Sequence, residues 1–214
     1  MGNFTSTFDD ISDLLQRGKA KDIVVAVEKA LTEGAAPVDI LEKGLISGMN
    51  EIGGKFKRGE IFVPEVLIAA RAMNHASAAL KPALVESGVK PVGKAVICTV
   101  KGDLHDIGKN LVRMMIEGKG IEVLDLGVDC TNEKIVETVQ NSDAKVVCLS
   151  ALLTTTMLSQ KEVIDALKVA GLRDKVKVMV GGAPVTQSYA DEIGADAYTP
   201  DAASAAEVCR NFFT

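Results

Sequence analysis

The segment KAVICTVKGDLHDIGKN, residues 94–110, decides how the second half of the chain is organised. It opens with a mostly apolar run, which predicts a buried β-strand over residues 94–100. Three ionisable side chains, Asp103, His105 and Asp106, follow this strand. The chain has two histidines in all, so one of them is expected between two carboxylates at one edge of a sheet.

The pattern of this strand recurs to the end of the chain. Further short apolar runs, rich in Val and Ile, lie at 121–125, 145–149, 176–180 and 195–198. Segments of helical character separate them, at 108–119, 131–141, 155–170, 184–192 and 201–212. Strands that alternate with helices predict a five-stranded parallel α/β domain of the flavodoxin-like (Rossmann-like) type, with strand order 2-1-3-4-5. Ligands of such sheets bind beyond the carboxyl ends of the strands.

The first half of the chain predicts a bundle of helices, so the fold class is α + α/β. Apolar residues recur at helical spacing over 6–17, 20–33, 38–58 and 64–87. Four helices joined by short loops favour an antiparallel bundle. The third helix carries Gly44, Gly48, Gly53 and Gly54, which we interpret as positions where another helix or a ligand approaches closely. The predicted domains are a helical domain (1–88), a linker (89–93) and an α/β domain (94–214).

Composition narrows the class of protein further. Hydrophobic residues make up 47% of the chain and aromatic residues 4%, and Trp is absent. The net charge of −5 disfavours nucleic acid as a partner. Four cysteines without C-x-x-C spacing predict buried free thiols in a reducing compartment. Because we find no signal peptide and no apolar run of about 18 residues, we expect a soluble, cytoplasmic protein with no membrane partner.

Three loops at the carboxyl edge of the predicted sheet carry small or polar residues in a fixed order. Asp103, His105 and Gly108 form a D-x-H-x-x-G pattern after the first strand. An S-x-L pattern at Ser150 and Leu152 follows the third strand, and a Gly-Gly pair, 181–182, follows the fourth. A neutral imidazole is a good ligand for a transition metal, and a carboxylate two residues earlier can accept its other ring N–H. Adjacent glycines leave room for a bulky group at the rim.

These motifs, in this order and spacing, resemble the cobalamin-binding domain of methionine synthase and its relatives. The stretch GKFKRGEIFVPEVLIAARAM, residues 54–73, also resembles the helical cap module of that family. The resemblance runs from about residue 10 to residue 212. The other domains of methionine synthase have no counterpart here, so the chain looks like a methyltransferase-cognate corrinoid protein. Such proteins serve methanol, methylamine, betaine and O-demethylase systems in methanogens and acetogens.

The resemblance implies a role for each motif. His105 would be the metal ligand, bound to cobalt from below in place of the cofactor's own base (base-off/His-on), with Asp103 as its hydrogen-bond partner. Thr156, where methionine synthase has serine, would extend this relay. The remaining implied cofactor-binding residues are Gly102, Leu104, Asp106, Ile107 and Gly108 in the first loop, Leu152 of the S-x-L pattern, Ser150, Thr154, Gly181 and Gly182 in the nucleotide slot, and Phe56 and Val63 in the cap.

The resemblance also implies a function, and it is one for which the chain itself supplies no catalytic residue. A corrinoid protein of this kind shuttles a methyl group, through Co(I) and methyl-Co(III), between two methyltransferases. One is specific for the methyl donor, and the second passes the methyl group to tetrahydrofolate or to a thiol such as coenzyme M. An ATP-dependent reductive activase would be a further partner. The methyl donor is chosen by the partner enzyme, so these residues do not name it.

Alternative interpretations remain open. The chain could be the cobalamin subunit of a radical mutase, a cobalamin-dependent regulator, or a flavodoxin-like domain for another nucleotide. Asp103 and Asp106 could hold Mg²⁺ as in a receiver domain, although the third strand ends in Cys148-Leu149-Ser150 without an acceptor Asp. His105 could be purely structural, and a closed zinc site is disfavoured because no Cys pair lies nearby. For His75 we expect packing inside the bundle.

Overall fold

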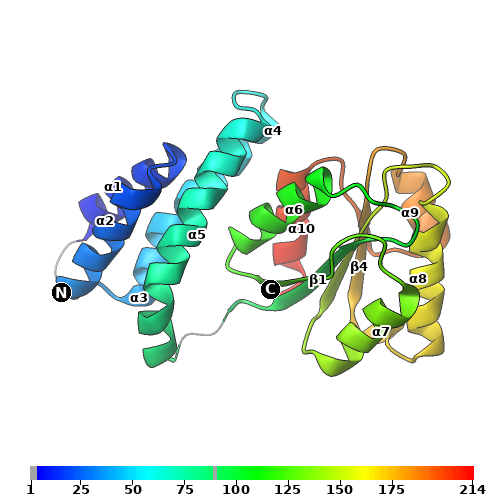
Figure 1. The fold of residues 1–214 in the computed structure, drawn as a ribbon. Helices are drawn as coiled ribbons and strands as arrows, with labels where there is room; N and C mark the ends of the chain where they lie inside the picture. The colour runs from blue at the N-terminus through cyan, green and yellow to red at the C-terminus, as the bar shows by residue number, and fades with distance from the viewer. Residues whose placement is uncertain (1–3, 89–90) are drawn as a thin grey trace. The chain divides into compact units, whose positions relative to one another are not determined.

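The computed structural model describes residues 4–88 and 91–214, which form two compact units that meet in the sequence at Pro91 and Val92 (Figure 1). The predicted linker, 89–93, includes residues 89 and 90, which lie outside the described residues. The first unit is α-helical, and the second contains a parallel sheet with helices on both faces (Figure 1). The fold class predicted from the sequence, α + α/β, is therefore confirmed.

The helical unit follows the four predicted segments closely. Its elements are α1 (Thr5–Gln16), α2 (Ala20–Thr32), α3 (Pro37–Asp39), η1 (Ile40–Ile46), α4 (Ser47–Lys57) and α5 (Val63–Glu86). The third predicted helix is one continuous stretch, but its middle part, η1, is π-helical. Helix α2 packs against α5, and α1 packs against η1 and α4.

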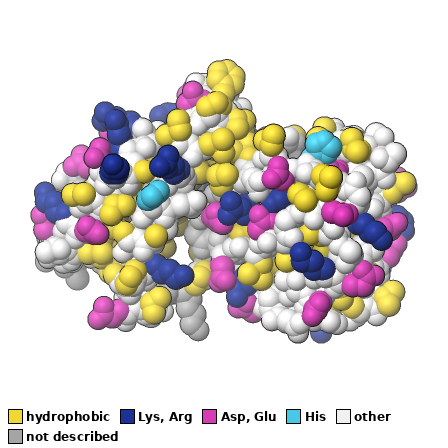
Figure 2. All heavy atoms as spheres, in the orientation of Figure 1, with side chains coloured by type: hydrophobic (Ala, Val, Ile, Leu, Met, Phe, Trp, Pro, Cys, Tyr) yellow, Lys and Arg dark blue, Asp and Glu magenta, His cyan; other side chains and the backbone are white. Residues whose placement is uncertain are grey.

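Two of the glycines in the third segment explain this packing. A β-carbon added at Gly44 would lie 2.9 Å from Ile11 Cγ2, and one added at Gly48 would lie 3.1 Å from the Ser12 carbonyl oxygen. Because α1 approaches the backbone so closely at these positions, the predicted close approach of a helix is confirmed there. The prediction for His75 was wrong, since its side chain is exposed on α5. Figure 2 shows both histidines of the chain at the molecular surface.

The sheet of the second unit has the predicted topology. Its strands are β1 (Lys94–Thr99), β2 (Glu122–Asp125), β3 (Val146–Ser150), β4 (Lys177–Gly181) and β5 (Ala197–Tyr198). They are all parallel, in the order β2-β1-β3-β4-β5. The register pairs Thr99 with Ser150 and Ser150 with Gly181, so the carboxyl ends of β1, β3 and β4 lie level at one edge. This alignment brings the three predicted loops together.

Helices cover both faces of the sheet. They are α6 (Ile107–Glu117), α7 (Asn132–Asn141), α8 (Leu158–Val169), α9 (Gln187–Ile193) and α10 (Ala202–Asn211), with a short 3-10 turn, η2 (Arg173–Lys175). Side-chain oxygens of Thr131, Thr186 and Asp201 accept backbone N–H groups at the starts of α7, α9 and α10. Helix α8 begins later than predicted because the amides of Thr156 and Met157 both bond back to Leu153 O in a turn.

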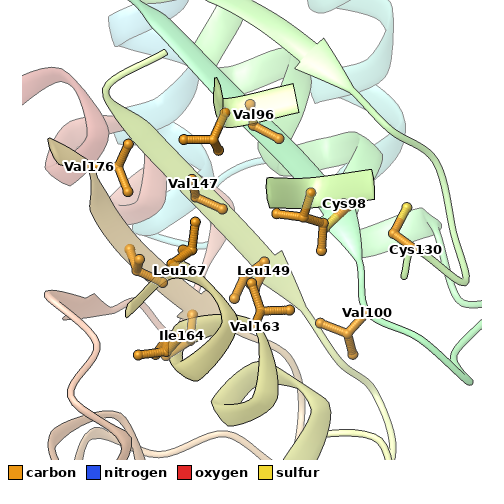
Figure 3. Close-up of a cluster of buried hydrophobic side chains, with 14 of the residues drawn as sticks. Val96, Cys98, Val100, Cys130, Val147, Leu149, Val163, Ile164, Leu167 and Val176 are labelled. Atoms are coloured by element: carbon orange, nitrogen blue, oxygen red, sulfur yellow. The ribbon is translucent and has the colours of Figure 1, made fainter. Parts of the chain in front are cut away.

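The main core of this unit lies between the sheet and helices α7, α8 and α9. Figure 3 shows Val96, Val147 and Leu149 of the strands facing Val163 and Leu167 of α8. The opposite face packs against α6 and α10, which also contact each other. All four cysteines are buried free thiols, as the sequence predicted. None of the helices in the described part of the chain combines the length and the apolarity that crossing a membrane requires.

Candidate functional site

The carboxylate of Asp103 is the centre of a hydrogen-bond network at the carboxyl edge of the sheet. Its side chain is fully buried. Oδ1 accepts the backbone N–H of His105 at 3.0 Å and lies 2.7 Å from His105 Nδ1. Oδ2 accepts the N–H of Leu152 and the hydroxyl of Thr156, both at 2.7 Å. Three residues predicted from the sequence therefore meet around this carboxylate, His105 from the loop after β1 and Leu152 and Thr156 from the loop after β3.

The state of this carboxylate follows from its partners. Burial raises the pKa of Asp103, but the hydrogen bonds from Thr156, Leu152 and His105 outweigh burial and hold the pKa below its ordinary value. An ionised Oδ1 next to the ring favours the proton on Nδ1 of His105. The other ring nitrogen, Nε2, then carries a lone pair, on a side chain that is 52% exposed. The imidazole is thus arranged to act as a single nitrogen ligand.

A residue that sequence reasoning missed, Asp129, clamps the loop that carries these groups. Its Oδ1 accepts the N–H of Gly102 at 2.8 Å, and its own N–H donates to Asp103 O at 3.0 Å. Apart from glycines, Asp129 is the only one of the described residues with a positive φ, which is 49°. Aspartate tolerates this conformation better than most residues. On the inner side of the loop, the hydroxyl of Thr99 donates to His105 O at 2.8 Å.

The Gly-Gly pair, 181–182, lies where the loops after β3 and β4 approach each other closely. Gly182 has φ 129°, and a β-carbon there would lie 1.7 Å from Ala151 O. The space that this glycine leaves is therefore filled by the loop after β3. The N–H of Ala151 also donates to Gly181 O at 3.1 Å. The loops after β3 and β4 are in direct contact beside Ser150, which is half-buried at the end of its strand.

Beneath these two loops lies Gln160, a second residue that sequence reasoning missed. Its side chain is fully buried on α8. Nε2 donates to Leu149 O at 2.9 Å and to Gly181 O at 3.1 Å, whereas Oε1 has no hydrogen-bond partner. Gln160, in the first turn of α8, shares the spacing of one helical face with Val163 and Leu167, and this spacing was a signal available in the sequence.

The two loops that form the Asp103 network also carry exposed apolar side chains. Leu104 and Ile107, on either side of His105 in the sequence, are 71% and 79% exposed. Leu152 and Leu153, in the loop after β3, are also exposed. Leu153 was not among the predicted residues, although it adjoins the S-x-L motif. Exposed large apolar side chains in these loops suit a ligand with a broad apolar surface.

The remaining predicted residues are separate from the Asp103 network. Asp106 Oδ2 accepts an N–H of Asn110 at 3.1 Å. Gly108 begins α6 with open space at its β-position, and Thr154 is exposed. Phe56 and Val63 belong to the helical unit and are both half-buried. No group of three or more His, Cys, Asp or Glu that could hold a metal ion exists in the described residues.

A buried ion pair anchors the helix that follows His105. Lys109 Nζ lies 2.7 and 2.6 Å from the two carboxylate oxygens of Asp125, at the end of β2. The lysine side chain is 2% exposed and the aspartate 27%. Burial raises the pKa of Asp125, but hydrogen bonds from Lys109 and Gly127 outweigh it and lower the pKa overall. The pair ties the first turn of α6 to the sheet.

Comparisons with known proteins find relatives that match nearly the whole chain. Residues 93–209 match a family described as a B12 binding domain, and residues 7–81 match a second family with the same description. A dimethylamine corrinoid protein of Methanosarcina barkeri is 48% identical over 92% of each chain. A cobalamin-binding protein from Desulfitobacterium hafniense has a TM-score of 0.80 at 34% identity, covering 96% of this chain and 98% of that one. The methanol:cobalamin methyltransferase complex from Methanosarcina barkeri has a TM-score of 0.86 at 30% identity, covering 97% and 80%.

Proposed function

Since the chain belongs to the family of B12-binding corrinoid proteins, we propose that it carries a methyl group on a bound corrinoid in a methylamine methyltransferase system. The single observation that supports this most is the Asp103–His105 contact, which prepares one ring nitrogen as a metal ligand. The similarity to a dimethylamine corrinoid protein over nearly the full length of both chains favours a methylamine as donor. The cobalt of the corrinoid would supply the atom that accepts and gives up the methyl group.

The residues present fit a corrinoid. One imidazole provides one ligand, which is all that a metal already held by a macrocycle needs from below. The exposed side chains of Leu104, Ile107 and Leu152 offer apolar contact to the macrocycle. In this proposal the cofactor is base-off/His-on, with His105 Nε2 as the axial ligand. Gly102, Asp106 and Gly108 line the first loop, and Ser150, Thr154, Gly181 and Gly182 line the slot for the lower nucleotide.

Asp103 and Thr156 would control the charge of the ligand. If Nε2 were released from the metal, it would be free to take up a proton, with the carboxylate of Asp103 next to the ring. If Nε2 were bound, the same carboxylate would hold the proton on Nδ1 and orient the ligand. The hydroxyl of Thr156 and the N–H of Leu152 keep Asp103 ionised in both situations. Ligation and protonation therefore compete at one nitrogen.

The helical unit would act as the cap over the methyl-bearing face. Phe56 and Val63 would supply apolar contacts that exclude water. The partners in this scheme are a methylamine-specific methyltransferase, a second methyltransferase that uses tetrahydrofolate or a thiol, and an ATP-dependent reductive activase. The free, buried cysteines suit the reducing conditions of a cytoplasm.

The axial ligand can be tested directly by electron paramagnetic resonance. The protein would be produced with ordinary and with ¹⁵N-labelled histidine, loaded with cobalamin and reduced to the Co(II) form. If histidine ligates cobalt, the nitrogen splitting changes from a triplet to a doublet on labelling, because the two nuclei differ in spin. His105→Gly should abolish this label-dependent change, and His75→Ala, an exposed control on α5, should keep it. A triplet that persists in the labelled wild type would exclude the proposed His-on state.

A further inference from the structure

Gln160 joins the ends of two neighbouring strands through one side-chain amide. Nε2 donates to Leu149 O near the end of β3 and to Gly181 O at the end of β4. The side chain comes from α8 and is fully buried. It thus spans the seam between β3 and β4 at the carboxyl edge, directly below the loops that begin at Ser150 and Gly182.

The orientation of this amide is determined by its partners. Both neighbours of Nε2 are carbonyl oxygens, which only accept hydrogen bonds, so the NH₂ group must face them. Flipping the amide would place Oε1 against two other oxygens, which is repulsive. Oε1 is therefore the free end of the amide, and it is buried without a hydrogen-bond partner. Because buried acceptors in proteins are normally hydrogen-bonded, we expect a donor to bind Oε1.

We infer that Oε1 of Gln160 accepts a hydrogen bond from a ribose hydroxyl of the corrinoid's lower nucleotide. This inference rests on the proposed function and adds a specificity-determining residue to it. Ser150 and Gly181, which flank the same seam, line the proposed nucleotide slot, and Gln160 bonds to the carbonyl of one of them. The ribose carries free hydroxyl groups, which are the donors that an amide oxygen requires. Nε2 meanwhile holds the two strand ends together.

Comparing the binding of two corrinoids distinguishes a role of Gln160 in nucleotide recognition from a purely structural role. Cobalamin contains the lower nucleotide, whereas cobinamide has the same macrocycle and lacks the nucleotide. Gln160→Met keeps the length of the side chain and removes both polar atoms. Aquocobalamin and aquocobinamide would be titrated into apo wild type, Gln160→Met and Gln140→Met, with binding followed by the visible spectrum. Gln140 is an exposed residue near the end of α7 and serves as the matched control.

We expect Gln160→Met to weaken cobalamin binding about tenfold, the effect of losing one hydrogen bond, and to leave cobinamide binding within about twofold of wild type. Gln140→Met should match wild type with both. An equal loss for both corrinoids, or no loss for either, would overturn the inference while leaving the proposed function intact. A wild type that binds neither corrinoid would overturn the proposed function and the inference together.

A measurement on the wild type covers the case in which Gln160→Met does not fold. The side-chain NH₂ resonances of Gln160 would be observed by NMR in ¹⁵N-labelled protein, in the presence of aquocobalamin or aquocobinamide, both of which are diamagnetic. A hydrogen bond to Oε1 polarises the amide, so these protons should shift downfield with cobalamin and not with cobinamide. Identical spectra in the two complexes would overturn the inference.

Discussion

Asp103 Oδ1 and His105 Nδ1 lie 2.7 Å apart, and the other carboxylate oxygen of Asp103 accepts two further hydrogen bonds from the loop after β3. The orientation of the imidazole is therefore tied to a loop about fifty residues away in the sequence. This relationship leads to the first prediction.

Asp103→Asn should weaken ligation by His105. The two carboxylate oxygens of Asp103 accept hydrogen bonds from four donors. The side-chain amide of Asn has only one oxygen, so its NH₂ group would face some of these donors and repel them. If the NH₂ group faces His105, the proton moves to Nε2 and the ligating lone pair is lost. We expect a 10- to 100-fold drop in the equilibrium constant for axial ligation, by analogy with other partners of metal-bound histidine. The visible spectrum of the loaded protein measures it.

Thr156→Ser and Thr156→Val form the matched pair for this prediction. Serine keeps the hydroxyl that donates to Asp103 Oδ2 at 2.7 Å, and valine replaces it with a methyl group. Ligation should be nearly unchanged in the serine variant and weakened in the valine variant. Equal ligation in both would show that the Thr156 hydroxyl has no part in holding the carboxylate.

Substitutions of Asp129 by Asn, Gly and Ala distinguish the contribution of its backbone conformation from that of its side-chain hydrogen bond. Asparagine keeps an acceptor for the Gly102 N–H and tolerates the φ of 49°. Glycine keeps the conformation without the acceptor, and alanine loses both. We expect axial ligation by His105 to fall in the order wild type, Asn, Gly, Ala. If Gly and Asn behaved alike, the side-chain bond to Gly102 would not position the loop.

Lys109→Met should destabilise the protein, because it removes the nearer of the two cations, Lys109 and Arg113, that face the partly buried carboxylate of Asp125. We expect a loss of about 2–4 kcal/mol in the free energy of unfolding, at the lower end of the range for buried pairs because Asp125 is 27% exposed. Urea unfolding of the apo-protein measures this loss. The double variant Lys109→Met/Asp125→Asn removes both charges and should recover part of the stability; failure to recover any would point to lost packing by the lysine stem.

Gly182→Ala should lower the stability of the protein much more than an alanine substitution at another glycine of positive φ. The added methyl would clash with Ala151 O at 1.7 Å, so the loop after β3 would have to move. Gly171→Ala, at φ 68° with open space around its β-position, carries only the conformational cost, about 1 kcal/mol. Thermal unfolding and cobalamin affinity should both fall further for Gly182→Ala. Similar values for the two variants would refute the close contact.

Acid should weaken the fold partly through Asp196, which lies far along the chain from the candidate site. Burial raises the pKa of this carboxyl, but the N–H of Val178 and the cations of Lys177 and Arg173 outweigh it, so the pKa is lowered. A lowered pKa in the folded state means that the stabilisation is complete above the ordinary carboxyl pKa and is lost as the pH falls below it. The stability difference between wild type and Asp196→Asn should therefore shrink between pH 7 and pH 3 in urea titrations.

Much of the fold was readable from the sequence because its signals are local. The short Val- and Ile-rich runs and the helical segments between them give the α/β alternation, and five such units fit the flavodoxin-like strand order. D-x-H-x-x-G places a carboxylate and an imidazole two residues apart, so their contact needs no information from elsewhere in the chain. The same holds for the glycines of the third helical segment, where a missing side chain permits close packing by α1.

Only the tertiary structure decided which distant groups complete the site. The bonds from Leu152 and Thr156 to Asp103, from Gly102 to Asp129, and from Gln160 to Gly181 cross between loops. Their partners are chosen by the register of parallel strands, which long-range packing sets and no local pattern encodes. The exposure of His75 and the π-helical turn at η1 are further results of packing, since they depend on which face of each helix the neighbouring helices cover. By itself, the sequence predicted the imidazole proposed as the ligand and its nearest partner, whereas the packed structure determined what holds that partner ionised and in place.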